Sequence, residues 1–398
     1  SDDGGTFPVT NPATGATIAE VASCGAAETR RAIEAAETAM QEWRRRSAKE
    51  RAAVLRRWFD LMMESQDDLA QILTAEQGKP LAEARGEVAY GASYIEWFAE
   101  EAKRIYGDTI PAPGEDKRIV VIRQPVGVVA CITPWNFPNA MLTRKIAPAL
   151  AAGCTVVCKP ANATPLSAFA FAELAERAGI PPGVINIVAG RTSEIGGELT
   201  SNPIVRKLTF TGSTPVGKKL MADCAGTVKR TSMELGGNAP FIVFDDADID
   251  AAIEGALASK YRNAGQTCVC ANRFLVQDGI YDEFAAKLAK ATASFTLGDG
   301  AEEGVTMGPL INEAAANDVL AFVEDAVAKG ASVVTGGVRS DLGSCFIEPT
   351  VLTNASKDMR VFSEEIFGPV APLFRFSSEE EAIAMANDTE FGPVSYTH

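Results

Sequence analysis

The residues best suited to chemistry lie past the middle of the chain, where Cys268 follows Gly265, Gln266 and Thr267 in a segment typical of a loop. A loop can present a thiol to a substrate, and nearby donors or positive charge can stabilise the reactive thiolate. The alternative is a small buried residue, as most single cysteines are. Cys270 completes a Cys-x-Cys pair, which is weak evidence for a metal, so we predict no metal site.

Any general base must be something other than histidine. The single histidine is the last residue, His398, so a Ser-His-Asp triad, a Cys-His dyad and a His-ligated zinc site are excluded. Glu234 is a candidate because Gly236 and Gly237 give its carboxylate room to move. An apolar cleft would make such a carboxylate a usable base near neutral pH. The alternative is a surface glutamate at a strand edge.

Two further segments could bind an oxyanion or a phosphate. Residues 133–138 hold Asn136 between two prolines, and its neutral amide could stabilise an oxyanion. Residues 210–217 should end a strand and open a helix, whose first amides could face a diphosphate. A rigid turn and an ordinary βα turn are the respective alternatives. The acidic turn at 364–369 indicates little by itself.

Strands and helices that could position these residues alternate along the chain. Residues 26–104 have helical spacing, with a capping box at Ser47 and Glu50. Later β-branched runs alternate with helical segments, a pattern typical of βαβ units and two α/β domains in series. We expect strands at 118–123, 126–132, 155–158, 184–188, 205–210, 241–244, 273–276, 332–334 and 371–376, and helices at 165–178, 249–261, 282–293 and 314–329.

The net charge is −15, from 37 Lys and Arg against 52 Asp and Glu. This excess of acid argues against binding to nucleic-acid phosphates and to an anionic membrane surface. No apolar run is long enough to predict a transmembrane helix, and no signal peptide is visible. The eight cysteines are scattered and do not form a disulfide framework. We therefore expect a cytoplasmic protein.

Six motifs in this order resemble the NAD(P)-dependent aldehyde dehydrogenase superfamily: PWNFP at 134–138, KPA at 159–161, FTGST at 210–214, ELGG at 234–237, GQTC at 265–268 and EEIFGP at 364–369. The match runs over residues 7–392. The resemblance implies an α/β fold with a Rossmann-type cofactor domain at 1–110 and 126–236, a small β oligomerisation arm at 111–125, and an α/β catalytic domain at 237–398. It also implies a homodimer or homotetramer.

The resemblance implies a mechanism as well. Cys268 would attack the aldehyde substrate, and the Asn136 amide with the Cys268 backbone N–H would hold the oxyanion. After hydride transfer to the nicotinamide, Glu234 would activate the water that hydrolyses the thioester. The residues expected to contact the cofactor are Trp135, Lys159, Asn162, Gly212, Ser213, Leu235, Glu365 and Phe367.

The choice of cofactor depends on Asn162. Many NAD-preferring relatives carry Glu at this position, where it binds both ribose hydroxyls. Without that carboxylate, Lys159 could pair with a 2′-phosphate, so we expect NADP rather than NAD. Similar enzymes carry Ser here, so Asn162 is a departure from their pattern.

Residues 142–145 and 261–272 are most similar to the bacterial succinate-semialdehyde dehydrogenases of GABA degradation. In similar enzymes Arg144 and Arg262 hold the distal carboxylate, a task that suits the guanidinium fork; surface salt bridges are the alternative. Other substrates would be glutarate semialdehyde or an uncharged aldehyde. Cys270 could form a reversible disulfide with Cys268, as in some relatives, or could fill space behind the loop.

Family members are usually longer at the C-terminus, and residues 393–398 depart from the family pattern. The expectation is therefore a catalytic domain that is incomplete at its C-terminus. This leaves an inactive cofactor-binding fragment of the fold as the alternative to an active dehydrogenase.

Overall fold

The computed structural model describes residues 1–392 and 395–397, which form two compact units. The first unit comprises Ser1–Val9, Thr17–Leu73 and Arg85–Glu234, and the second comprises Thr10–Ala16, Thr74–Ala84 and Leu235–His398. These units are defined by packing alone, so the assignment of a cofactor domain, a catalytic domain and an arm stays a prediction. Within the segment 393–398, residues 393, 394 and 398 lie outside the described residues. No helix in the described part of the chain is long and apolar enough to cross a membrane.

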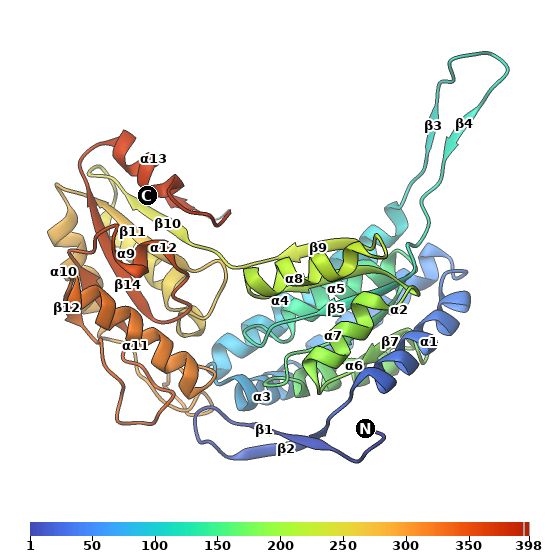
Figure 1. Ribbon diagram of the computed structural model, residues 1–398, viewed down its shortest axis with the longest axis horizontal. Helices are drawn as coiled ribbons and strands as arrows, with labels where there is room; N and C mark the ends of the chain where they lie inside the picture. The colour runs from blue at the N-terminus through green and yellow to red at the C-terminus, as the bar shows by residue number, and fades with distance from the viewer. Residues whose placement is uncertain (393–394, 398) are drawn as a thin grey trace. The chain divides into compact units, whose positions relative to one another are not determined.

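The first unit contains a five-stranded parallel sheet in the order β7-β6-β5-β8-β9 (Figure 1). These strands span Ile185–Ile187, Thr155–Lys159, Val128–Ile132, Val205–Thr211 and Arg230–Glu234, respectively. In the central register, Cys131 of β5 lies opposite Cys158 of β6 and Thr209 of β8. After β5, the chain adds β6 and then β7 on one side of it, and then adds β8 and β9 on its other side. The sheet therefore has the Rossmann-type order that was predicted, with a switch point between β5 and β8.

Helices of the first unit bury their apolar residues against this sheet and against one another. Four helices come before the first strand of the sheet in the sequence: α1 (Ala26–Trp43), α2 (Ala48–Glu64), α3 (Gln66–Gln77) and α4 (Leu81–Glu101). Four more alternate with the strands: α5 (Ala140–Ala151), α6 (Leu166–Arg177), α7 (Thr192–Ser201) and α8 (Thr214–Ala225). Trp58 and Phe171 pack in the core with ring centroids 4.3 Å apart. Burying a ring such as Phe171 stabilises a fold by roughly 1.5–3 kcal/mol. The predicted capping box is confirmed, since Ser47 and Glu50 each accept a hydrogen bond from the other's backbone N–H, at 2.7 and 3.3 Å.

Two antiparallel ribbons complete the first part of the chain. β1 (Thr6–Thr10) pairs with β2 (Thr17–Ala22), and β3 (Asp108–Ile110) pairs with β4 (Ile119–Val121). The β3–β4 ribbon extends away from the helices of its unit (Figure 1), and all its strand residues are exposed. The strand expected at 118–123 is therefore present but shorter. The predicted role of this ribbon in oligomerisation stays a prediction.

The second unit contains a six-stranded sheet in the order β12-β13-β14-β11-β10-β15. These strands span Ser332–Thr335, Thr350–Thr353, Val370–Phe376, Ala271–Gln277, Ala239–Val243 and Tyr396–Thr397, respectively, and β12 alone is antiparallel to its neighbour. The helices are α9 (Ile249–Lys260), α10 (Tyr281–Thr292), α11 (Glu313–Ala328), α12 (Arg360–Ser363) and α13 (Glu379–Asn387). The core between them includes Phe241, Phe274 and Phe374. The expected α/β architecture is confirmed, and the predicted elements agree within a few residues.

Candidate active site

Four candidate residues of the first unit lie at the carboxyl-terminal edge of its parallel sheet. Lys159 ends β6 and Glu234 ends β9, while Asn136 comes shortly after β5 and Ser213 shortly after β8. Because parallel strands end at the same edge, the fold brings these four positions to one side of the sheet. Gly212 N donates to Glu234 O at 3.1 Å, which ties the turn after β8 to the end of β9.

The switch point between β5 and β8 carries buried hydroxyl groups. Thr133 follows β5 and Thr211 ends β8, and among the described residues neither Oγ1 atom has a hydrogen-bond partner. Ser213 is the N-cap of α8 but its side chain makes no capping hydrogen bond. Free hydroxyls beside a helix N-terminus can donate to phosphate oxygens. This edge therefore has the chemistry that a dinucleotide diphosphate requires.

Lys159 and Asn162 lie close together just beyond β6. Lys159 is buried, and its Nζ donates to Pro160 O at 3.2 Å and lies 3.5 Å from Asn162 Oδ1. Burial lowers the pKa of Lys159 to about 8. The Asn162 amide is occupied by the backbone of Gly190: Nδ2 donates to the carbonyl at 2.7 Å, and Oδ1 accepts from the N–H at 3.2 Å. Asn162 therefore fixes the turn before α7.

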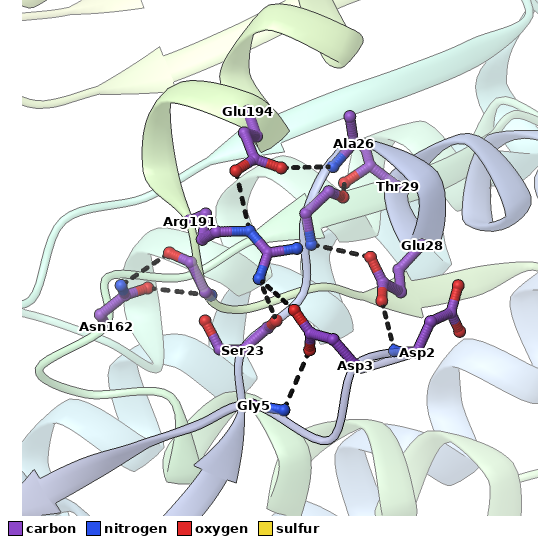
Figure 2. Close-up of polar contacts among 12 residues, drawn as sticks. Asp2, Asp3, Gly5, Ser23, Ala26, Glu28, Thr29, Asn162, Arg191 and Glu194 are labelled. Carbon is purple, nitrogen blue, oxygen red and sulfur yellow. Dashed lines mark hydrogen bonds and ion pairs between the residues drawn. The ribbon is translucent and has the colours of Figure 1, made fainter.

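The same turn is held on its other side by Arg191 (Figure 2). The Arg191 guanidinium pairs with Asp3 at 3.1 Å and with Glu194 at 2.8 Å. It also donates to the carbonyl of Ser23 at 3.3 Å. These contacts use the charge of Arg191 within the protein.

Arg144 is held by aromatic residues. Its Nε donates to Ala140 O at 3.3 Å, and its Nη2 donates to the Tyr90 hydroxyl at 3.0 Å. The guanidinium carbon lies 5.4 Å from the ring centroid of Tyr90 and 5.0 Å from that of Tyr94, within the range of a cation–π interaction. Within residues 1–392 and 395–397, no ion pair joins Arg144 to a carboxylate. The sequence did not point to Tyr90 or Tyr94.

Helix α4 carries these tyrosines on the face that contacts the start of α5. Glu87, one turn earlier, accepts hydrogen bonds from Asn139 N at 2.9 Å and Ala140 N at 3.2 Å. A buried carboxylate at a helix N-terminus satisfies free donors and suits the helix dipole. Gly91 lies on the same face, where a Cβ would overlap the side-chain oxygen of Asn139. This contact fixes the position of the α5 residues that follow.

Electrostatic interactions place Glu234 in the same neighbourhood. The pKa of Tyr94 is raised to about 12, mainly by burial and then by its hydrogen bond to Tyr90. The negative charge of Glu234 adds a smaller upward effect. Burial lowers the pKa of Lys145 to about 8, and the groups that oppose this shift include Glu234. The first unit thus brings the predicted base, Glu234, near the predicted substrate cation, Arg144. The Glu234 side chain itself is exposed.

Three loops of the second unit meet at the amino-terminal edge of its sheet. Gly237 precedes β10, Cys268 precedes β11 and Glu365 precedes β14, and these three strands are parallel. Gly237 N donates to Glu365 Oε1 at 3.1 Å. A Cβ at position 237 would lie 2.5 Å from Cys268 O, so this approach requires glycine. Burial raises the pKa of Glu365 to about 7.

The segment leading to Cys268 has an unusual backbone. Asn263, Ala264 and Gly265 have consecutive positive φ angles of 54°, 53° and 74°. Left-handed backbone is strained for residues other than glycine and is held in place by its surroundings. Here Asn263 N donates to Glu83 Oε2 at 2.8 Å, and the close contact of Gly265 with the backbone of Gly368 closes the turn.

The two cysteines of the Cys-x-Cys pair differ in environment. Cys268 is half-buried, whereas Cys270 is buried and its thiol donates to Lys260 O at 3.4 Å. Burial raises the pKa of Cys270, so its thiol stays protonated. Cys270 occupies space behind the loop in this conformation, while its predicted redox role stays a prediction.

Asn272 joins the loops of the second unit and was not predicted as a functional residue. Its Nδ2 donates to Glu364 O at 2.9 Å and to Asn238 Oδ1 at 2.6 Å, and its Oδ1 accepts from Ile366 N at 3.1 Å. The sequence feature that could have indicated its role is a polar residue at the start of a buried strand. Asn272 therefore positions the segment that carries Glu365.

The other candidates are distributed between the units. In the first unit Trp135 is half-buried and Asn136 is buried; in the second, Leu235 and Phe367 are half-buried and Arg262 is exposed. Asn136 and Cys268 belong to different units, as do Arg144 and Arg262, so their joint action stays a prediction.

Comparison with known proteins agrees with the motifs. The aldehyde dehydrogenase family model matches residues 1–397. The chain belongs to this family. It is 65% identical over 396 residues to glutarate-semialdehyde dehydrogenase of Pseudomonas aeruginosa. It is 61% identical over 396 residues to succinate-semialdehyde dehydrogenase [NADP(+)] of Escherichia coli. Each alignment covers 100% of this chain and 82% of the relative. The crystal structure of succinate-semialdehyde dehydrogenase from Burkholderia pseudomallei has a TM-score of 0.99 at 63% identity, with 100% of this chain and 82% of that chain covered.

Aldehyde dehydrogenases use NAD(P), and the first unit fits such a cofactor. The unpartnered hydroxyls of Thr133 and Thr211 and the start of α8 face the switch point, where a diphosphate binds in sheets of this order. Lys159 supplies the one buried cation at the end of β6. In this aldehyde dehydrogenase, no carboxylate occupies position 162 to compete for it.

Proposed function

We propose that this chain oxidises an aldehyde that carries a distal carboxylate, with succinate semialdehyde as the substrate and NADP as the cofactor. The observation that carries the proposal is Arg144, whose guanidinium is held by Tyr90 and Tyr94 and forms no ion pair with a carboxylate among the described residues. A half-buried cation without an acidic partner suits an anionic ligand. The names of the two semialdehyde dehydrogenase relatives support this class of substrate.

Cys268 is the nucleophile of the proposed reaction. Its Sγ adds to the aldehyde carbon, and the Asn136 amide and the Cys268 backbone N–H hold the resulting oxyanion. NADP, when bound, supplies the hydride acceptor that allows a thioester to form on Cys268. Glu234 then takes a proton from the water that hydrolyses this thioester and releases the acid.

The cofactor would be held mainly by the first unit. Gly212 and Ser213 at the start of α8 would bind the diphosphate, and Lys159 would pair with the 2′-phosphate. Glu365 would bind the nicotinamide ribose, and Trp135, Leu235 and Phe367 would line the site. NADP is favoured over NAD because the side chain at 162 is a neutral amide that is already bonded to Gly190.

Glutarate semialdehyde is the second candidate substrate. The relative from Pseudomonas aeruginosa, at 65% identity, is named for it. The two aldehydes share a distal carboxylate and differ by one methylene, so Arg144 and Arg262 would serve either. Because one methylene is worth only about 1–3 kcal/mol in a pocket, discrimination between them should be modest.

A substrate panel tests the proposed function. NADPH formation is followed by absorbance with succinate semialdehyde, glutarate semialdehyde and butanal, and each is repeated with NAD. We expect kcat/KM to be highest for succinate semialdehyde with NADP, and Cys268→Ala to abolish turnover while NADP still binds. Equal or better turnover of butanal would overturn the substrate class. Better turnover with NAD would overturn the choice of cofactor, and near-normal turnover of Cys268→Ala would overturn the mechanism.

A further inference from the structure

We propose that the hydroxyl pair of Tyr90 and Tyr94 determines substrate specificity, by binding the distal acid group of the aldehyde together with Arg144. This inference rests on the proposed function, because it assigns residues to the acid-binding part of that same site. It depends on contacts within the first unit alone.

The geometry makes the three residues a single group. Tyr90 and Tyr94 lie four positions apart on α4 and therefore share a face, with ring centroids 5.2 Å apart and hydroxyl oxygens 2.7 Å apart. Arg144 reaches this pair from α5, donating to the Tyr90 hydroxyl at 3.0 Å. The Glu87 cap and the close contact of Gly91 with Asn139 hold α4 and α5 together on either side of Tyr90. The group is thus positioned before any ligand binds.

One of the two tyrosine hydroxyl protons has no acceptor among the described residues. The hydroxyls of Tyr90 and Tyr94 carry one proton each, and the hydrogen bond between them uses one of the two. The Tyr90 oxygen also accepts from Arg144. In the part of the chain that the structure describes, no acceptor is present for the remaining proton. Whichever tyrosine donates to the other, one O–H is left to bind an external acceptor.

Arg144 leaves donors unused in the same way. A guanidinium has five N–H donors, of which Nε uses Ala140 O and one on Nη2 uses the Tyr90 hydroxyl, leaving three among the described residues. Three guanidinium N–H groups and one phenol O–H form a cluster of four unused hydrogen-bond donors. Such a cluster matches the several lone pairs of a carboxylate and offers nothing to an alkyl chain.

Tyr94 remains a hydrogen-bond donor over the working pH range. Burial and the hydrogen bond to Tyr90 raise the pKa of Tyr94 to about 12, so this phenol keeps its proton. The charge of Glu234 adds a smaller upward effect on the pKa of Tyr94 than burial or the hydrogen bond to Tyr90. The cluster therefore stays positive near neutral pH and favours an anionic group.

The test compares the double variant Tyr90→Phe/Tyr94→Phe with the wild-type chain and with Tyr106→Phe, because either single change would leave the other phenol O–H free to donate. Tyr106 is an exposed residue of the same unit, 67% accessible and outside the cluster, and serves as the matched control. Phenylalanine keeps the ring beneath Arg144 and removes only the hydroxyl. We expect KM for succinate semialdehyde to rise about tenfold more than KM for butanal in the double variant, since a hydrogen bond to a charged group is worth about that factor. Tyr106→Phe should leave both values unchanged.

Binding of succinate, measured by calorimetry without turnover, provides a second readout. We expect its Kd to rise about tenfold in the double variant and to rise less in each single variant, which keeps one phenol O–H, so the single variants provide a graded test even if the double variant folds poorly. Equal changes in KM for the two aldehydes, or an unchanged succinate Kd, would overturn the role of the tyrosines while leaving the proposed function intact. A wild-type chain that does not prefer succinate semialdehyde over butanal would instead overturn the proposed function.

Discussion

Asn162 and Gly190 are joined by two hydrogen bonds, of 2.7 Å from the side-chain amide to the carbonyl and of 3.2 Å from the backbone N–H to the side-chain oxygen. The amide of Asn162 is thus committed to the turn before α7 and only its Oδ1 also approaches Lys159. A carboxylate at this position could still accept a hydrogen bond from Gly190 N, but it could not donate one to Gly190 O. Position 162 consequently couples the shape of the turn to the charge beside Lys159.

Replacing Asn162 by Asp should weaken both the fold and the binding of NADP. Asp has nearly the same shape, but it cannot donate to Gly190 and places negative charge against that carbonyl. We expect a loss of about 1–3 kcal/mol in the free energy of unfolding. The Kd for NADP should rise more than that for NAD, because the new charge repels the 2′-phosphate. Fluorescence titration and urea unfolding measure the two effects, and equal changes in both Kd values would contradict the prediction.

The preference for NADP should decline in alkaline solution. Burial lowers the pKa of Lys159 to about 8, so the free protein loses this cation as the pH rises through that value. The ratio of the Kd for NADP to the Kd for NAD should therefore increase between about pH 7 and pH 9. Lys159→Arg keeps the charge and should flatten this profile. A wild-type ratio that is constant over this range would show that Lys159 does not bind the 2′-phosphate.

Alkylation should distinguish Cys268 from Cys270 in the native protein. Cys268 is half-buried, whereas Cys270 is buried with a raised pKa and a hydrogen bond to Lys260 O. We expect iodoacetamide to modify Cys268 at least about tenfold faster, as read by peptide mass spectrometry. In Cys268→Ala, Cys270 should remain protected until urea is added. Rapid labelling of Cys270 in the folded variant would show that its thiol leaves this contact readily, as a disulfide with Cys268 requires.

The stability of the protein should depend on the protonation of Glu365. Burial raises the pKa of its carboxyl from 4.5 to about 7, so between these values the folded chain holds a proton that the unfolded chain has released. Stability must therefore fall as the pH rises from about 4.5 to about 7, and it stays lower above that range. Glu365→Gln has no proton to lose, so its stability relative to the wild type should increase across the same range. A difference in unfolding free energy that does not vary with pH would contradict this.

Local sequence signals predicted most of the elements because those signals act over short distances. The capping box joins Ser47 and Glu50, which are only three positions apart in the sequence, and it forms as expected. Alternating strands and helices predicted the parallel sheets, and the turn after Phe210 opens α8 at Thr214. From the sequence, the glycines at 236 and 237 indicate room for the Glu234 side chain, whereas in the structure a Cβ at 236 would overlap Glu365 Oε2 and one at 237 would lie 2.5 Å from Cys268 O.

Contacts between distant segments could not be read from the sequence. Tyr90 and Arg144 are 54 positions apart, and Tyr90 alone looks like one more aromatic residue on a helix. Asn162 meets Gly190 only because β6 and β7 are neighbours in the sheet. Asn272 reaches Glu364 across 92 positions. Each of these depends on the order of strands and on how two helices pack, which residue type and spacing leave undetermined.

The close contact between Gly91 and Asn139 limits how the substrate range of this protein could be re-engineered. Any side chain larger than glycine at position 91 would overlap Asn139 Oδ1 unless that amide moved, so a library that randomises the α4 face should recover few variants there. Glu87 is similarly committed to the start of α5. Positions 90 and 94, whose side chains contact Arg144, are therefore the first to randomise, and an exhaustive two-site screen of them is practical.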